Sequence, residues 1–267
     1  MNAPHKSSGG GVRAWAAYLR ALGSSPAPTH GPDTPVKAHR WGFGAFLLAQ
    51  LVFLLVSVFL AAMFRPGAGE PLSPAGLLLT LSVPIVLAAG VGIAATRTRG
   101  NGPLVDLRIE WRWSDVVLGL TIGVISLVPT LIASSLWTKW MGKDEASSAV
   151  GNVLDGVHLS PTIAVLVFLH LWLIAPICEE ILYRGLVWGA AERLGWSRWA
   201  AFAVSTSIFA VAHLEPARTP LLLVIAIPIG LARLITGRLL ASIVAHQVNN
   251  LLPALGLLLT VLGVMPA

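Results

Sequence analysis

Long stretches without Asp, Glu, Lys or Arg divide the chain into apolar segments that are joined by short polar connections. Five stretches are at least 23 residues long, and two are shorter. A helix needs about 20 apolar residues to cross a bilayer, so each long stretch predicts a spanning helix. We expect the two shorter ones to be helices packed inside the bundle. The long stretches are 41–64, 71–96, 116–138, 156–178 and 239–267, and the short ones are 199–214 and 219–232.

The pattern predicts an all-α integral membrane protein, a bundle of about seven to eight transmembrane helices. The count is seven if the segment from Pro161 to Leu194 forms one helix. It is eight if that segment breaks near Pro176, because proline removes a backbone donor and kinks a helix. Nothing in the sequence resembles the alternating strands of a membrane β-barrel.

Composition supports a membrane location. The chain is 55% hydrophobic and 11% charged, whereas an ordinary soluble domain is about one quarter charged. A mean hydropathy of +0.78 excludes a disordered chain. The single cysteine, Cys178, excludes an intramolecular disulfide and a cysteine-rich metal site.

The distribution of basic residues predicts the orientation. With the N-terminus inside, thirteen Lys and Arg residues lie on the inner side and four on the outer side. Such an excess marks the cytoplasmic side, so we expect the N-terminus in the cytoplasm and, after seven spans, the C-terminus outside. The net charge of +6 is then a topology signal, and we expect the lipid bilayer and no nucleic acid as a partner.

Residues 1–40 differ from the rest of the chain, because glycine, serine and proline are frequent there. We interpret 1–40 as a mobile cytoplasmic tail and 41–267 as the membrane helix bundle. Within the tail, residues 13–22 form either a short interfacial helix or plain disorder.

Three apolar segments carry polar side chains that are costly in hydrocarbon. They are Glu179–Arg184, Phe209–His213 and His246–Asn250. A charge in the membrane interior costs at least about 2.5–3.5 kcal/mol, so these groups need a structural or functional reason.

Helical geometry predicts how the side chains face. Glu180 and Arg184 are one turn apart in the order that favours an ion pair. Glu179 points about 100° away and is left to face something else. His246 and Asn250 share a face, and both are possible hydrogen-bond donors.

The predicted depths bring these groups together. With a rise of about 1.5 Å per residue, Glu179 and His213 lie roughly 20 Å from the inner ends of their helices. His246 lies about 12 Å and Asn250 about 18 Å from the inner end of theirs. A carboxylate beside a histidine can deprotonate a water, and a second histidine with an amide can stabilise an oxyanion. We therefore expect one buried polar site with the parts of a hydrolase that needs no covalent nucleophile.

These residues resemble the CAAX protease and bacteriocin-processing (CPBP, Abi) family of intramembrane glutamic endopeptidases. The family carries Glu-Glu-x-x-x-Arg, Phe-x-x-x-His and His-x-x-x-Asn in this order, and they stand here at 179–184, 209–213 and 246–250. The CAAX-protease-like core covers about 160–255. Tyr183-Arg184-Gly185 is similar to bacterial members, so the resemblance implies a bacterial plasma membrane protein that cleaves a peptide or protein substrate at the membrane.

The resemblance also implies a role for each motif residue. Glu179 would be the base on the attacking water, with His213 as its partner. His246 and Asn250 would form the oxyanion site. The supporting residues, which orient and neutralise the site or pack beneath it, would be Glu180, Arg184 and Phe209.

Alternative functions remain open at this point. The polar residues also suit a non-catalytic membrane scaffold or a bacteriocin-immunity-type protein. A proton-coupled transporter is a further alternative, although the chain lacks the repeats typical of transporters. Two histidines and a glutamate are a possible zinc set, but the chain has no His-Glu-x-x-His, and the resemblance points to metal-independent catalysis. We expect no metal and no cofactor.

Several other residues have a structural interpretation. We expect Cys178 to be a small core residue and not a nucleophile, His170 to be an interior histidine whose polar atoms are satisfied, and Glu215 to be a loop charge. Gly119 and Gly123 have the spacing of close helix packing.

Overall fold

The computed structural model describes residues 17, 21, 37–65, 67 and 72–265. Within these residues it contains helices and no strand. The predicted tail lies almost wholly outside the described residues, and so does its possible helix at 13–22.

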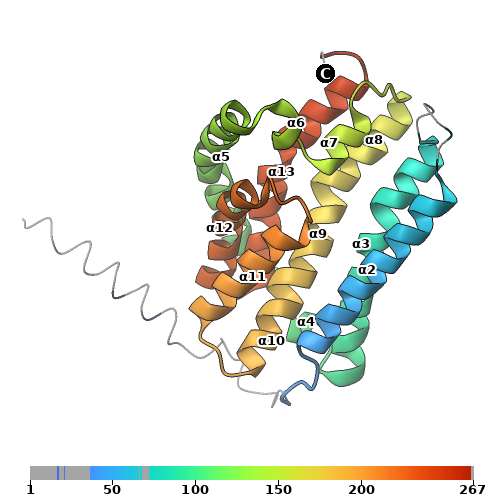
Figure 1. Cartoon of the computed structure of the whole chain (residues 1–267). Helices are drawn as coiled ribbons and strands as arrows, with labels where there is room; N and C mark the ends of the chain where they lie inside the picture. Colours follow the sequence, from blue (N-terminus) through green and yellow to red (C-terminus); the bar gives the residue numbers. More distant parts are fainter. Residues whose placement is uncertain (1–16, 18–20, 22–36, 66, 68–71, 266–267) are drawn as a thin grey trace, which may run out of the picture.

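The helices follow one another as antiparallel passes through one bundle (Figure 1). In chain order they are α2 (Phe43–Met63), α3 (Pro74–Arg99), α4 (Pro103–Asp106), α5 (Trp113–Met141), α6 (Lys143–Ala146), α7 (Ala149–Leu154), α8 (Pro161–Leu169), the π-helix η1 (His170–Ile174), α9 (Ala175–Glu180), the π-helix η2 (Ile181–Val187), α10 (Trp188–Arg193), α11 (Arg198–Ala212), α12 (Thr219–Thr236) and α13 (Leu239–Val261).

Six helices of the described chain are long and apolar enough to cross a membrane. They are α2, α3, α5, the continuous run Pro161–Arg193, α12 and α13, and the shorter apolar helix is α11. The all-α membrane architecture is therefore confirmed. The helix α2 begins at the end of the bundle opposite to the one where α13 ends (Figure 1).

One expectation about length was wrong. The apolar stretch 219–232 looked too short to span, but α12 continues to Thr236 and has the length of a span. Its charged residue Arg233 is 1% exposed, and its Nη1 donates to the carbonyl of Leu107 at 3.3 Å. A buried and hydrogen-bonded guanidinium does not end a helix, so the charge was a poor boundary signal.

The long helix from Pro161 to Arg193 does not break at Pro176. The π-helix η1 lies directly before this part of the chain, and η2 follows α9. Proline removes one backbone hydrogen bond and clashes with the carbonyl four residues earlier. A wider turn before Pro176 accommodates both effects, so the chain passes through the proline as one helix. Such π-turns are frequent at functional sites.

Close approach of α5 and α13 depends on two glycines. A Cβ atom at Gly119 would lie 2.6 Å from the carbonyl oxygen of Ala241, and one at Gly123 would lie 2.6 Å from the Cβ of Val248. Real Cβ atoms do not come so close, so the two helices pack backbone to backbone. The predicted role of this spacing is confirmed, and α13 carries two motif residues on another face.

Arginines tie the helices together at the end of the bundle where α2 begins. Arg193 at the end of α10 donates to the carbonyl of Arg40 at 2.7 Å, and Arg233 of α12 holds Leu107. Two further pairs between an arginine and a carbonyl are Arg108 with Gly237 and Arg198 with Leu234. Each joins two separate segments of the chain, so these arginines hold the segments at this end of the bundle together.

Candidate active site

His246 of α13 lies between two neighbouring carboxylates of α9. Its Nδ1 is 2.9 Å from Oε1 of Glu180, and its Nε2 is 3.5 Å from Oε2 of Glu179. The side chain of Glu180 is 0% exposed and that of Glu179 is 19% exposed. Although the two glutamates point in different directions, they reach one imidazole through its opposite nitrogens. Glu180 therefore orients the ring from within, and Glu179 lies on its more open side.

Glu180 and Arg184 form the ion pair that their spacing predicts. Nη1 of Arg184 is 2.9 Å from Oε1 of Glu180, and both side chains are 0% exposed. Nη2 of Arg184 also donates to the carbonyl of Ala226 on α12 at 3.1 Å. The same carboxylate oxygen thus receives hydrogen bonds from Arg184 and His246. This arrangement fixes the imidazole against three helical segments.

Phe209 of α11 lies at the centre of the site. Its ring centroid is 4.6 Å from that of His213 and 5.6 Å from that of His246. The guanidinium carbon of Arg184 lies 4.7 Å from the same centroid, and Tyr183 packs edge-on against the ring. Phe209 is therefore the contact through which the motif histidines of two helices belong to one cluster.

His213 caps the C-terminal end of α11 and is half-buried. Its Nδ1 is 2.7 Å from the carbonyl oxygen of Phe209. A carbonyl can only accept a hydrogen bond, so Nδ1 carries a proton and Nε2 is the nitrogen left for another partner. Glu179 and His213 are not hydrogen-bonded to each other in the described chain, and Phe209 links them only through the shared cluster.

Asn250 lies one turn beyond His246 on α13. Its Nδ2 donates to the carbonyl of Leu171 in the π-helix η1 at 3.3 Å. The neighbouring His170 is held by Ser82 of α3, with 3.1 Å between Nδ1 and Oγ. His170 is thus the satisfied interior histidine that was predicted, and its contact with α3 steadies the turn that Asn250 contacts.

Asn249 is an unusual neighbour of the site. Its side chain is 4% exposed, yet neither Nδ2 nor Oδ1 has a hydrogen-bond partner among the described residues. Leaving such an amide unsatisfied costs about 1–3 kcal/mol. It is therefore a candidate contact for a water molecule beside the site.

Sequence reasoning missed two groups that shape this cluster. It did not predict the hydrogen bond between His246 and Glu180, because that contact depends on how two helices that are distant in sequence pack together. It also missed Leu171, which contributes a backbone carbonyl and so leaves no side-chain signal.

Among the described residues, no three His, Cys, Asp or Glu side chains gather as a metal-binding group.

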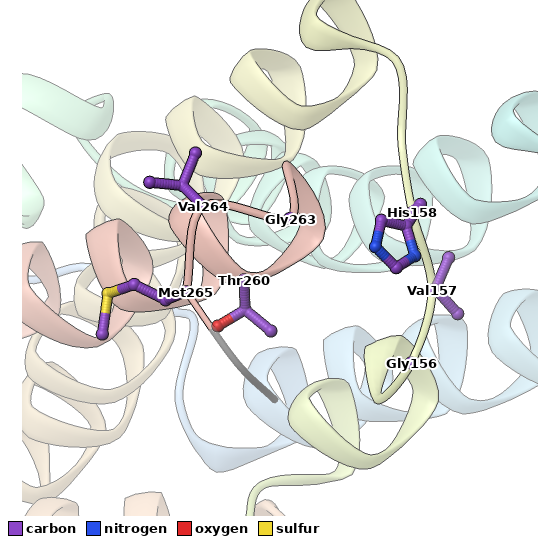
Figure 2. Close-up of a pocket in the computed structure, with 7 residues that line it drawn as sticks. All are labelled: Gly156, Val157, His158, Thr260, Gly263, Val264 and Met265. Atoms are coloured by element: carbon purple, nitrogen blue, oxygen red, sulfur yellow. The ribbon is translucent and has the colours of Figure 1, made fainter.

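A cavity of about 410 Å³ lies elsewhere, at the end of the bundle where α13 ends (Figure 2). It is lined by residues 156–158 before α8 and by Thr260 and residues 263–265 of the C-terminal segment. His158 and Thr260 flank it from two sides (Figure 2). None of the motif residues lines this cavity.

Comparison with known proteins gives one match. Residues 161–252 match a family model described as Rce1-like, type II CAAX prenyl endopeptidase. No curated protein and no solved structure matches the chain. The matched range runs from the start of α8 into α13 and contains all seven motif residues discussed above.

Proposed function

Because residues 161–252 match the family model of Rce1-like type II CAAX prenyl endopeptidases, we propose that this chain is an intramembrane endopeptidase that hydrolyses a peptide bond with activated water. The observation that carries the proposal is the position of His246, which is held by the fully buried Glu180 and faces Glu179. A buried carboxylate that orients an imidazole toward a second reactive group is the geometry of acid–base catalysis.

In the proposed reaction, Glu179 takes one proton from a water while the water oxygen bonds to the carbonyl carbon of the substrate. The carbonyl oxygen becomes an oxyanion. When the C–N bond breaks, the proton passes from Glu179 to the leaving amine, and the products are a carboxylic acid and an amine. His213, whose Nε2 is left for another partner, shares the water with Glu179.

His246 and Asn250 are the proposed oxyanion donors. Nδ1 of His246 donates to Glu180, so Nε2, which lies 3.5 Å from Oε2 of Glu179, is the nitrogen that we assign to the oxyanion. The amide of Asn250 uses one hydrogen on Leu171 and has a second one for the oxyanion. Donation from Nε2 needs the form of His246 in which both ring nitrogens carry a proton. Removing one oxyanion donor costs about 10²–10³-fold in kcat in other hydrolases.

The proposed setting is a bacterial plasma membrane. The end rich in arginine, where α2 begins, faces the cytoplasm according to the charge rule, and the N-terminus lies on that side. The proposed substrate is a peptide or protein at the membrane. The proposed chemistry needs no metal and no cofactor.

The experiment uses the full-length protein in liposomes with a library of membrane peptides, and cleavage is read by mass spectrometry. The wild type is compared with Glu179→Gln and with a wild-type sample treated with a chelator. Glu145→Gln is the matched control, because Glu145 is an exposed glutamate on α6, outside the site. Glutamine keeps the size of the side chain but removes the base.

Cleavage that is lost in Glu179→Gln and kept in Glu145→Gln and with chelator supports the proposal. Cleavage that persists in Glu179→Gln overturns the mechanism, and cleavage lost with chelator overturns its metal independence. A folded wild type that cleaves nothing in the library points to the non-catalytic scaffold or immunity function, and proton flux without cleavage points to a transporter.

A further inference from the structure

His213 differs from the other motif residues in its position along its helix. Glu179 and Glu180 lie in α9, and His246 and Asn250 lie well inside α13. His213 instead stands at the C-terminal cap of α11, where the chain leaves the helix. Its ring is bonded to the carbonyl of Phe209 on its own helix, but the backbone that carries the ring also depends on the segment that follows.

That segment begins with a strained residue. Leu214 has a φ of 55°, in the left-handed region, which costs an ordinary residue about 1–2 kcal/mol. Glycine usually occupies this place after a helix. The side chain of Leu214 is 74% exposed, so its own packing does not compensate. Contacts of the following residues must hold the backbone in this conformation.

Glu215 supplies these contacts. Its Oε1 accepts a hydrogen bond from the backbone N–H of Ala149, the first residue of α7, at 2.6 Å. Its Oε2 is paired with Arg218. Its carbonyl accepts from the backbone N–H groups of Arg218 and Thr219, each at 2.9 Å. Both the side chain and the backbone of Glu215 are thus fixed.

A second anchor comes from α5. Nε1 of Trp137 donates to the carbonyl of Ala217 at 2.9 Å. The segment from Leu214 to Arg218 is therefore held by α7 through Glu215 and by α5 through Trp137. The helices α6 and α7 lie at the end of the bundle where α13 ends (Figure 1). The hydrogen bond from Ala149 to Glu215 therefore connects α7 to the segment that follows His213.

We infer that Glu215 is a positioning residue for His213. By fastening the chain to the first turn of α7, it holds Leu214 in its left-handed conformation and so fixes the exit of α11 and the orientation of the imidazole. The sequence alone assigned Glu215 only a loop charge. The inference rests on the proposed function for its catalytic consequence, whereas the positioning itself can be measured without activity.

The test compares Glu215→Ala with Glu215→Gln, and Glu145→Gln on α6 is the control. Glutamine keeps an acceptor for the N–H of Ala149 but loses the charge that pairs with Arg218. The first readout is the rate at which diethyl pyrocarbonate modifies His213 in the full-length protein, measured by mass spectrometry. The rate at His158 in the same sample is the internal reference.

We expect at least a threefold change in the His213 rate in Glu215→Ala, and a rate close to wild type in Glu215→Gln and Glu145→Gln. With a cleavable peptide, we expect kcat of Glu215→Ala to fall by about 10–100-fold, because displacing a reacting group by about 1 Å has this effect. KM should stay within twofold, and Glu215→Gln should recover most of the activity.

An unchanged His213 rate in Glu215→Ala overturns the inference, whether or not the protein cleaves a peptide. A loss of kcat that Glu215→Gln fails to recover also overturns it, because the anchor to α7 would then not be what matters. If the wild type has no peptidase activity, the modification rates still decide the positioning, so its failure and that of the proposed function are distinguishable.

Discussion

Glu180→Gln is the substitution whose effect on stability can be worked most directly from the structure. Glu180 is 0% exposed, and its Oε1 lies 2.9 Å from both Arg184 and His246. Glutamine has nearly the same shape and keeps one acceptor oxygen. The change therefore removes the negative charge and leaves the guanidinium of Arg184 buried without a counter-charge.

The expected cost is large. Breaking a buried ion pair by removing one partner destabilises a protein by about 3–5 kcal/mol, because an uncompensated charge stays in the interior. Since about 1.4 kcal/mol corresponds to a factor of ten, the unfolding equilibrium constant should rise by roughly two to three and a half powers of ten. Replacing Arg184 by Met in the same chain removes the stranded charge and should recover about 1–3 kcal/mol.

The measurement is reversible unfolding in mixed micelles with increasing SDS, followed by circular dichroism. Glu110→Gln is the matched control, because Glu110 pairs with Arg112 at 2.8 Å while their side chains are 32% and 55% exposed. Such a pair contributes only about 0–1 kcal/mol. The reasoning about the buried pair is refuted if Glu180→Gln destabilises the protein no more than Glu110→Gln does. It is also refuted if the double variant with Arg184→Met loses as much stability as the two single variants together.

Three further predictions use the same unfolding assay. Gly123→Ala should lower stability by about 1–3 kcal/mol, because its Cβ would lie 2.6 Å from the Cβ of Val248, and an unchanged value would contradict the close packing of α5 on α13. Asn249→Leu should lower stability by about 1 kcal/mol, because it removes the buried amide that we expect to bind a water molecule, and an increase would show that the amide has no partner. Leu214→Gly should raise stability by about 1 kcal/mol by relieving the left-handed strain, and a decrease would show that its side chain contributes.

Local geometry explains what the sequence predicted well. The pair of Glu180 and Arg184 follows from a spacing of four residues on one helix, and the close approach at Gly119 and Gly123 follows from small side chains one turn apart. Both inferences need only the repeat of a helix. The run of uncharged residues likewise identified the spanning helices, since burial in lipid excludes unpaired charge.

Contacts between distant helices explain what the sequence did not predict. The bond from His246 to Glu180 depends on how α13 packs against α9, and no spacing along the chain encodes it. Arg233 ended an apolar stretch of the sequence, but in the structure it lies within α12, where its guanidinium donates to the carbonyl of Leu107. The passage through Pro176 without a break depends on a π-turn, which hydropathy does not reveal.

The arginines that hold segments together at one end of the bundle have a consequence for how the protein is made. Insertion of the helices and their later assembly are separate stages, and in the first stage the orientation depends on the placement of positive charge. Lysine at Arg193 or Arg233 would preserve that charge and hence the orientation. It would lose the planar guanidinium with its several N–H donors. Arg193 uses this group to bond the carbonyl of Arg40, and Arg233 uses it to bond the carbonyl of Leu107. Lysine at both places would therefore preserve the orientation of the helices and weaken the contacts of α10 and α12 with Arg40 and Leu107.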